Sequence, residues 1–386
     1  MPFDYIIVGA GIAGITAAEE LANVMDKKVL LIDKEDHVGG ICYDFKDETG
    51  QLVHKHGLHV FHSNNSFVFN YLSLFTTWRK FNLKLLYRDY GTLIPVPFNF
   101  ISIDKCLPSV SEEIKTSLLD NYEINSRIPI RELKDSGDKY LNMLGEYAYD
   151  RFCEYFKKLY DITDSEIEGF EDRMFPFRMS YDCRYYTSIY QGVPTYGYTE
   201  MFKNMLSNHN ITVMLNKDYN EVLSIDYENY MVYYEGEEFK GHLIFTGMID
   251  EFFDYRYGEL EYNCILYDNE VVDKSKFQDN CVVIYSEDYH FTRINDYSYL
   301  SDDYSDATVA QFEYPVRYDR FDKQQNVPYY PVDLEENVKV YEKYKKLSED
   351  YDNITFIGRL AEYKLYEMDE VVEQVLKLIS EKFVDN

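Results

Sequence analysis

Basic residues are scarce in this chain of 386 amino acids: 39 lysines and arginines stand against 69 aspartates and glutamates, a formal net charge of −30. A chain of this charge repels nucleic acid and anionic lipid, and no lysine- or arginine-rich run offsets the repulsion. We therefore expect neither a nucleic-acid nor a membrane partner. An anionic ligand would need a few arginines gathered locally against the overall field.

Cysteines are also few, and no C-x-x-C pair occurs among the six, which are Cys42, Cys106, Cys153, Cys183, Cys264 and Cys281. This argues against a structural zinc site or a disulfide framework and suits a reducing compartment. No uninterrupted apolar run reaches the ~18 residues of a membrane span. The first residues, "MPFDYIIV", lack the basic segment of a signal peptide. The sequence predicts a cytoplasmic protein.

Buried strands alternate with a helical pattern at the start of the chain. "DYIIV" (residues 4–8) and "KVLLID" (28–33) have the continuous apolar character of buried strands, and a helical pattern runs between them from about Ile12 to Val24. This order predicts an α/β doubly wound parallel sheet. "HLIFTG" (242–247) and "NITFIG" (353–358) are predicted to return to that sheet, and an amphipathic helix is predicted from about 368 to 384.

The turn after the first strand contains Gly9-x-Gly11-x-x-Gly14. The first glycine permits the tight turn, the second lets backbone approach a pyrophosphate, and the third permits close helix–strand packing. Phosphates would face N–H groups at the positive end of the helix. Asp33 ends the second strand within reach of a ribose hydroxyl. Either FAD or NAD would suit this turn, and Gly39-Gly40, just beyond the acidic residue, favour FAD.

Two further segments differ in pattern from the first sheet. Residues 106–160 are helical in periodicity, whereas residues 180–196 and 260–315 alternate aromatic and polar side chains, as antiparallel strands do. We therefore predict a Rossmann-type FAD-binding domain with an inserted helical domain and an inserted antiparallel β-sheet substrate domain. The approximate boundaries are 1–65, 197–250 and 345–386 for the FAD-binding domain, 100–175 for the helical domain, and 66–99, 176–196 and 251–344 for the sheet domain.

Four of the eight histidines lie in "HKHGLHVFH", residues 54–62. The spacing alone leaves a metal site, a catalytic cluster and a structural role open.

Seven segments in order resemble those of bacterial-type UDP-galactopyranose mutases: "DYIIVGAGIAG", "LLIDKEDHVGG", "HKHGLHVFH", "YQGVPTYGYT", "FFDYRYGELEY", "VPYYPV" and "IGRLAEYKLYEM". The resemblance covers nearly the whole chain. It implies an FAD-dependent enzyme, active in the reduced form, that converts the pyranose ring of a nucleotide sugar to a furanose, UDP-galactopyranose by default. It also implies that reduced-flavin N5 attacks the anomeric carbon and displaces the nucleotide diphosphate.

The same resemblance assigns residues to the cofactor. His59 would pack against the flavin, with Val60 adding a backbone contact, and the other three histidines of the cluster would be structural, without a metal. The start of the last helix, at Glu367 and Met368, would face N1/O2 of the reduced flavin. The predicted cofactor residues are Gly9, Gly11, Ala13, Gly14, Asp33, Lys34, Gly39, Gly40, Ile41, His59, Val60, Arg359, Glu367 and Met368.

The resemblance assigns a second group to the substrate. Arg293, Tyr185 and Tyr330 would bind the diphosphate, and Tyr155 would stack on uracil. The predicted substrate residues are Tyr155, Phe156, Tyr160, Tyr185, Arg293, Tyr330 and Leu365. The predicted catalytic residues are His59, Arg173 and Arg293.

Departures from the family pattern lie mainly on the substrate side. Tyr160 stands for the usual tryptophan, Leu365 for a tyrosine and Glu367 for an aspartate. Met174 occupies the place of the mobile-loop arginine, with Arg173 one residue earlier. These changes favour another nucleotide sugar, such as UDP-arabinopyranose or a deoxy-sugar nucleotide, as the alternative substrate.

Alternatives of another class are a flavin oxidoreductase with the same FAD lobe and a non-catalytic nucleotide-sugar-binding flavoprotein. The reductant is unidentified, with NAD(P)H as a candidate. The sequence leaves the oligomeric state open, with a homodimer as one candidate.

Overall fold

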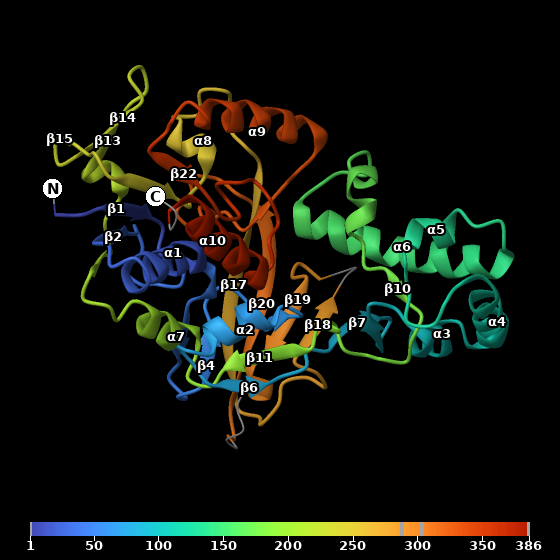
Figure 1. Cartoon of the computed structure of the whole chain (residues 1–386). Coiled ribbons are helices and arrows are strands. Elements are labelled where there is room, and N and C mark those ends of the chain that lie inside the picture. The colour runs from blue at the N-terminus through green and yellow to red at the C-terminus, as the bar shows by residue number, and fades with distance from the viewer. Residues whose placement is uncertain (1, 286–288, 301–304, 384–386) are drawn as a thin grey trace.

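The computed structural model of the chain describes residues 2–285, 289–300 and 305–383 (Figure 1). Within these residues, a parallel sheet joins distant parts of the sequence, in the order β12 (Ile211–Met214), β2 (Val29–Ile32), β1 (Tyr5–Val8), β16 (His242–Phe245) and β22 (Ile354–Phe356). β1 and β2 are buried along their whole length, as expected of strands covered on both faces.

Helices cover both faces of this sheet. α1 (Ile12–Asn23), α2 (Ser66–Leu72), α7 (Tyr198–Met205) and α10 (Met368–Lys382) pack on one face, and α8 (Ile249–Phe252) and α9 (Glu335–Ser348) pack on the other. Successive residues of β1 point to opposite faces of the sheet. Ile7 packs in the core with α1, α2, α7 and α10, and Ile6 packs in the core with α8 and α9. The predicted α/β fold class is confirmed, and the four predicted strands and the last helix are found. That helix ends at Lys382, and residue 384 lies outside the described residues.

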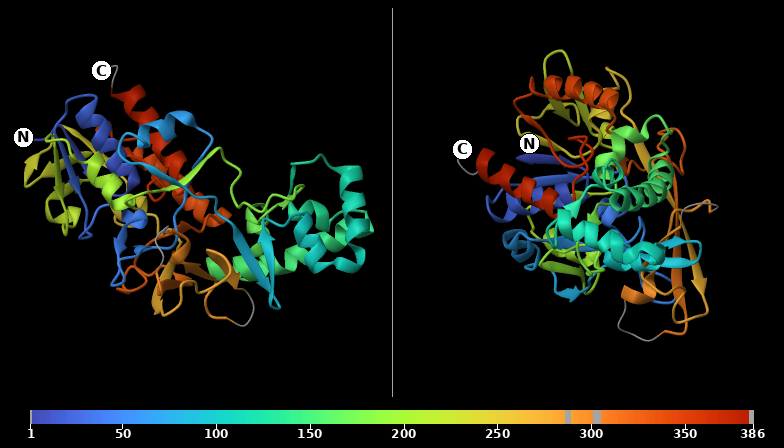
Figure 2. Two further views of the ribbon diagram at one scale, coloured as in Figure 1. Left: turned by 90° about the horizontal axis from the view of Figure 1, so that it is seen from below. Right: turned by 90° about the vertical axis from the view of Figure 1, so that its right-hand side faces the viewer.

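The helical region forms an arm that projects away from the parallel sheet (Figures 1 and 2). Its helices are α3 (Phe100–Cys106), α4 (Ser111–Asn121), α5 (Ile130–Lys134) and α6 (Lys139–Tyr160). The prediction of one helical stretch from 106 is wrong in its start and continuity. Asn99 caps α3 by accepting the N–H of Ile101 at 2.9 Å, so the helix begins earlier. Pro108 and Pro129 mark interruptions, and β9 (Arg127–Ile128) pairs with β10 (Phe177–Arg178).

A larger sheet stands between the arm and the parallel sheet. Its strand order is β21 (Tyr330–Pro331), β17 (Tyr262–Val272), β20 (Thr308–Arg317), β19 (Arg293–Asp296), β18 (Val282–Tyr285), β7 (Leu85–Asp89) and β8 (Thr92–Val96). Every pair is antiparallel except β18 with β7. Strands are thus confirmed within 260–315, although turns interrupt them.

The predicted strand region 180–196 is largely wrong, because only β11 (Tyr190–Pro194) forms there, pairing with β5 (Phe61–Ser63) and β6 (Trp78–Lys80). The preceding residues follow an irregular path that the buried side chain of Arg178 holds by donating to the carbonyl oxygens of Arg184 and, at 2.9 Å, Tyr185. The remaining short elements are β3 (Asp44–Lys46), β4 (Leu52–His54), β13 (Leu223–Asp226), β14 (Met231–Tyr234), β15 (Glu237–Glu238) and the 3-10 turns η1 (Gly40–Cys42), η2 (Pro108–Val110), η3 (Ile167–Arg173), η4 (Tyr219–Glu221) and η5 (Tyr297–Leu300).

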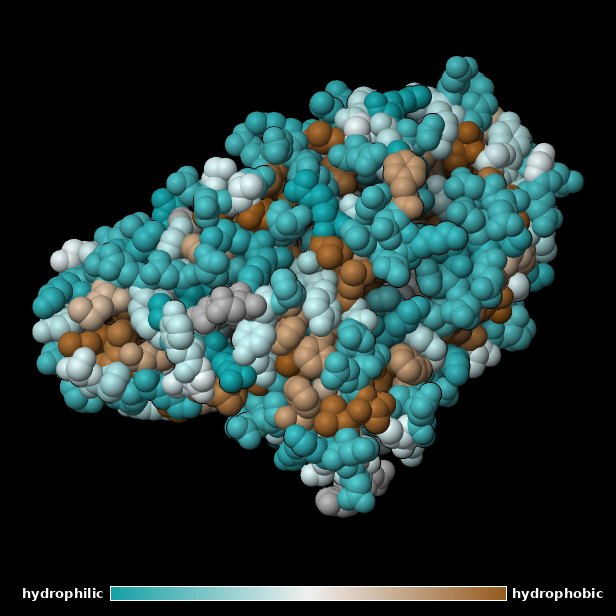
Figure 3. All heavy atoms as spheres, turned by 180° about the vertical axis from the view of Figure 1, so that it is seen from behind, coloured by the Kyte–Doolittle hydropathy of each residue, from teal (hydrophilic) through white to brown (hydrophobic). Residues whose placement is uncertain are grey.

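The surface is mainly hydrophilic on the face opposite Figure 1, with separate apolar patches (Figure 3). Among the helices that the structure describes, none is long and apolar enough to cross a bilayer. The cytoplasmic location and the domain boundaries stay predictions. α2 falls inside the predicted sheet domain but packs with α10 in the core of the parallel-sheet part.

Candidate active site

One cavity of about 510 Å³ runs from the glycine turn to the large sheet and the arm, a size ordinary for ligand sites. It brings together every predicted site residue except Gly14 and Gly39. Site residues predicted from the sequence thus come from the parallel-sheet part, the helical arm and the large sheet, and they line the same cavity.

The three glycines of the turn have different surroundings. A Cβ on Gly9 (φ +103°) would lie 2.1 Å from Thr246 Oγ1, and one on Gly14 would lie 1.9 Å from the carbonyl oxygen of Gly9. Gly9 is therefore required by its positive φ and by the Thr246 side chain, and Gly14 by the close approach of backbone. At Gly11 no atom lies within 4 Å of a Cβ position, so open space faces the start of α1. A phosphate fits there, against the positive end of a 12-residue helix.

Asp33 stabilises the same turn. Its carboxylate accepts the N–H of Ala10 at 2.6 Å and that of Glu35 at 2.9 Å. Burial raises the pKa of this carboxyl, and the two N–H bonds partly oppose the rise. Gly39 (φ +111°) donates its N–H to the carbonyl oxygen of Ala10 at 2.7 Å and lies behind the cavity wall rather than on it. Lys34, Gly40 and Ile41 line the cavity beside Asp33.

The histidine turn, residues 54–59, forms the next part of the wall. Nδ1 of His59 lies 2.8 Å from the carbonyl oxygen of Gly57 and must carry the proton, since a carbonyl only accepts. The N–H of His59 donates to Nδ1 of the buried His54 at 2.9 Å. Burial lowers the pKa of His54 to about 3, and burial together with the neighbouring His54 and Arg359 lowers the pKa of His59 to about 3. Both rings are neutral at physiological pH.

Among the described residues, no group of three or more His, Cys, Asp or Glu side chains is arranged to hold a metal ion. His62 instead stacks on the ring of Tyr186, with centroids 3.5 Å apart, and its Nε2 lies 3.4 Å from the carboxylate of Glu367. Burial alone would raise the pKa of Glu367, but the contact with His62 and the charge of Arg359 bring it below its usual value.

Glu367 is also the N-cap of α10, and its N–H donates to Glu370 Oε2 at 2.8 Å. It lines the cavity with Met368. Arg359 lies close by, donates to the carbonyl oxygen of Tyr366 at 2.7 Å, and has its guanidinium 5.4 Å from the Tyr330 ring. The carboxylates in the first turn of α10 partly offset the positive end of the helix.

The far end of the cavity holds a buried cation. Nε of Arg293, on β19, donates to the hydroxyl of Tyr155 at 2.7 Å and lies 3.6 Å from the carboxylate of Glu313 on β20. Burial disfavours the charge, but Tyr155 and Glu313 outweigh burial and raise the pKa of Arg293. The guanidinium is therefore charged in a chain that is otherwise strongly acidic.

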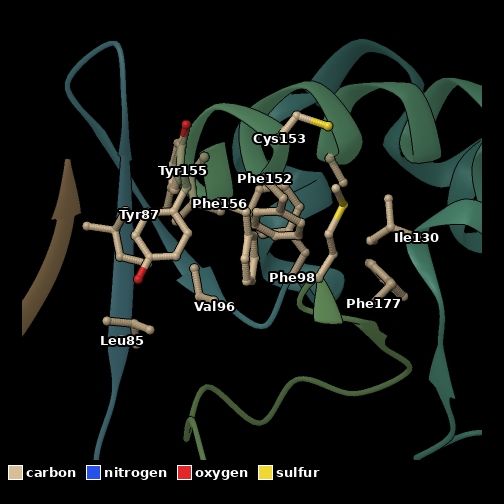
Figure 4. Packing of buried hydrophobic residues seen from close by; sticks show 14 of the residues in the cluster. Leu85, Tyr87, Val96, Phe98, Ile130, Phe152, Cys153, Tyr155, Phe156 and Phe177 are labelled. Atoms are coloured by element: carbon tan, nitrogen blue, oxygen red, sulfur yellow. The ribbon is translucent and has the colours of Figure 1, made fainter. Parts of the chain in front are cut away.

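Tyr155, which binds this cation, belongs to an aromatic cluster to which α6 contributes. Tyr155 and Phe156 lie with Phe152 and Phe98 in one packed cluster between the arm and the large sheet (Figure 4). The Tyr155 ring stacks on Phe175 with centroids 5.8 Å apart. Its hydroxyl is bound to Arg293, so the ring has a fixed orientation toward the cavity that it lines.

Arg173, at the end of η3, lines the cavity and forms an ion pair with Asp333, just beyond β21. Its guanidinium lies 5.1 Å from the Phe170 ring and 5.8 Å from the Tyr160 ring. Met174, the residue at the predicted loop-arginine position, is buried at 5% exposure and is absent from the lining. Arg173, not Met174, therefore lines the cavity, and its cation is engaged by a carboxylate.

The remaining predicted substrate residues complete this end. Tyr185 and Tyr330 line the cavity, and the N–H of Tyr330 donates to the buried Asn263 at 2.7 Å. Leu365 lines it from the partly exposed segment before α10. Burial raises the pKa of the Tyr185 and Tyr330 hydroxyls, which therefore stay protonated and can donate to an anion.

The sequence profile of the UDP-galactopyranose mutase family matches residues 151–365, more than half of the chain, and that of an NAD(P)-binding Rossmann-like domain matches residues 7–74. The chain belongs to the UDP-galactopyranose mutase family. It is therefore an enzyme, a mutase of the isomerase class, and the resemblance stated from the sequence is confirmed.

Relatives support the family over the full length. A dTDP-fucopyranose mutase of Escherichia coli is 30% identical over 386 residues and covers 96% of both chains. A UDP-galactopyranose mutase of Mycoplasma genitalium is 29% identical over 376 residues and covers 96% of this chain and 92% of its own. The crystal structure of a reduced UDP-galactopyranose mutase has a TM-score of 0.73 at 15% identity and covers 98% of this chain and 95% of its own.

Sequence reasoning missed several polar residues of the mutase that lie at the cavity. Glu313 and Asn295 line it beside Arg293, and Tyr329 lies with its hydroxyl 3.4 Å from Nε2 of His59. The signal for Glu313 was its place in "ATVAQFEYP", where Val309, Gln311 and Glu313 share one face of a strand. Polar residues on the same strand face as buried apolar residues indicate a buried hydrogen-bond network or a binding site.

Proposed function

We propose that this mutase uses FAD, active in the reduced form, to convert the pyranose ring of a nucleotide sugar to the furanose, with UDP-galactopyranose as the default substrate. The observation that carries the proposal is the single cavity that joins the Gly9–Gly14 turn, the neutral His59 and the buried Arg293–Tyr155 pair. A dinucleotide and an anionic substrate would meet there.

The residues present fit FAD. Open space in front of Gly11 accommodates the pyrophosphate, and Asp33 borders the cavity where a ribose would lie. Beyond the turn, His59, Val60 and Met368 would enclose the flavin ring. Bound reduced FAD would supply the nucleophile for the anomeric carbon. The neutral His59 brings no charge to it and cannot act as a general acid near neutral pH, because its pKa is about 3.

The chain's own residues would hold the leaving diphosphate. Arg293 provides a desolvated cation, and the protonated hydroxyls of Tyr185 and Tyr330 provide neutral donors nearby. Such donors stabilise charge that develops on the departing oxygen. Arg173 would join them once its guanidinium leaves Asp333, and the aromatic rings of Tyr155, Phe156 and Tyr160 would face the nucleobase.

A second substrate class remains a candidate within the same chemistry. The E. coli relative is a dTDP-fucopyranose mutase, and Tyr160 and Leu365, both departures from the family pattern, line the cavity. We therefore keep a deoxy-sugar nucleotide and UDP-arabinopyranose as alternative substrates. NAD(P)H as the reductant and a homodimer also stay proposals.

Two measurements test this function. The purified protein should be yellow and release FAD on heat denaturation, and a colourless protein with high affinity for NAD would contradict the cofactor. Dithionite-reduced enzyme should then be given UDP-galactose, UDP-arabinose and dTDP-fucose separately, with the furanose products resolved by chromatography. The best kcat/KM identifies the substrate, and absence of furanose from all three would contradict the assignment of these substrate classes.

A further inference from the structure

A buried polar network, made of hydrogen bonds and one ion pair, connects Arg293 with the histidine turn. Arg293 and Asn295 alternate on β19, and their cross-strand partners on β20 are Glu313 and Gln311. All four side chains therefore lie on one face of the sheet, where directly opposite residues interact. Asn295, Gln311 and Glu313 are each less than 5% exposed.

Asn295 lies at the centre of this network. Its Nδ2 lies 2.8 Å from Glu313 Oε1 and 3.2 Å from Gln311 Oε1, and it donates to both. Glu313 reaches Arg293 with its other oxygen, 3.6 Å from Nε. The amide of Asn295 thus uses one N–H group to hold the carboxylate that accompanies the cation and the other to bind Gln311.

Gln311 connects this network to the histidine turn. Its Nε2 donates to the carbonyl oxygen of His54 at 2.8 Å, and the hydroxyl of Tyr297 lies 2.9 Å from its Oε1. A Cβ on Gly57, inside the histidine turn, would lie 3.2 Å from Glu313 Oε1, so the carboxylate also abuts this turn directly. The polar groups leave the turn and Arg293 little freedom to move separately.

We propose that Asn295 is a positioning residue of the mutase: it holds Glu313 so that Arg293 is fixed for the substrate's diphosphate, and through Gln311 it ties that position to the histidine turn. The inference rests on the proposed function, since it assigns the diphosphate to Arg293. A buried network of this kind specifies one arrangement only while each member has its partners. Loss of the Asn295 amide leaves Glu313 free to pair with Arg293 in other geometries.

The test compares Asn295→Leu with the wild-type holoenzyme, using UDP as the probe. Leucine has the same number of side-chain heavy atoms and the same branch at Cγ as asparagine, and it removes both donors. We expect the Kd for UDP to rise at least about fivefold, because a charge-assisted contact is misplaced. KM for the nucleotide sugar should rise more than kcat falls, since binding is affected first. UDP should also change the visible spectrum of the bound flavin less than in the wild type.

Tyr71→Phe is the matched control. It removes one hydrogen bond, 2.6 Å long, to the buried carboxylate of Glu19, and neither residue lines the cavity. It should lower stability without changing the Kd for UDP by more than about twofold, because distant sites act independently. If Asn295→Leu does not fold, Asn295→Ser, which retains one donor, is measured in its place.

An unchanged Kd and flavin response in the folded Asn295 variant would overturn the inference while leaving the proposed function intact. Equal changes in the Asn295 and Tyr71 variants would overturn it as well, since they would reflect general destabilisation. A wild-type protein that binds FAD but neither UDP nor dTDP would instead contradict the proposed function itself.

Discussion

Replacement of Arg293 by lysine separates the geometry of the buried cation from its charge. Arg293→Ala would leave Glu313, 4% exposed, without its cation, and breaking a buried pair in this way costs about 3–5 kcal/mol of stability. Arg293→Lys keeps a positive charge beside Glu313. It removes the planar guanidinium. In the wild type, Nε of this group donates to the Tyr155 hydroxyl at 2.7 Å, and its other two nitrogens can face an anion.

The expected magnitude follows from the lost contact. A charge-assisted hydrogen bond contributes roughly 1.5–3 kcal/mol, which corresponds to a fall in kcat/KM of about tenfold to 150-fold. Because the cation remains, the free energy of unfolding should change much less. The loss should be seen in activity and UDP binding before it is seen in stability.

The assay is furanose formation by the reduced enzyme over a range of nucleotide-sugar concentrations, together with urea unfolding. Arg317→Lys is the control: it lies on β20 of the same sheet, is 53% exposed, does not line the cavity, and pairs with Asp161 and Glu261 at 3.9 and 3.7 Å. It should leave kcat/KM unchanged. Full activity of Arg293→Lys would refute the proposal that the planar guanidinium, and not only its charge, binds the substrate's diphosphate.

Three further outcomes are expected. Gly14→Ala places a Cβ 1.9 Å from the Gly9 carbonyl oxygen, so the purified variant should lose FAD, and a variant as yellow as the wild type would contradict the turn geometry. Arg173→Ala should raise KM but lower unfolding stability by no more than about 1 kcal/mol, because its pair with Asp333 is partly exposed, and unchanged kinetics would remove Arg173 from the substrate site. His54 binds protons more weakly folded (pKa about 3) than unfolded (about 6.5), so stability is lost as pH falls, by about 1 kcal/mol between about pH 7 and pH 5.5 for this residue alone. Urea unfolding should show a shallower pH slope for His54→Asn, and an equal slope would rule out the buried neutral ring.

The parallel sheet was readable from the sequence because β1 and β2 are contiguous apolar runs buried on both faces. The glycine turn was readable because Gly9 and Gly14 each answer a local steric demand, whereas Gly11 leaves open space at the start of α1. The irregular path through residues 180–189 was not, since it depends on Arg178 binding carbonyl oxygens further along the chain. Aromatic alternation there resembled a strand that does not form.

The candidate site was predictable residue by residue but not in its pairings. Arg293 and Tyr155 are 138 positions apart, and no local pattern shows that their side chains meet. The partner of Arg173 was equally hidden, because Asp333 comes from a distant loop. Glu313 could have been noticed as an acid on a buried strand face, but its contact with Asn295 needed the strand register.

The most direct test of the central claim is to measure furanose product and consumed reductant in one anaerobic reaction. The enzyme is reduced once with a limited amount of dithionite, and UDP-galactose, UDP-arabinose or dTDP-fucose is added in large excess. A mutase returns its electrons in every cycle, so we expect many furanose molecules per flavin with no further loss of reductant. Reductant consumed in proportion to product, or no furanose from any of the three, would contradict the account.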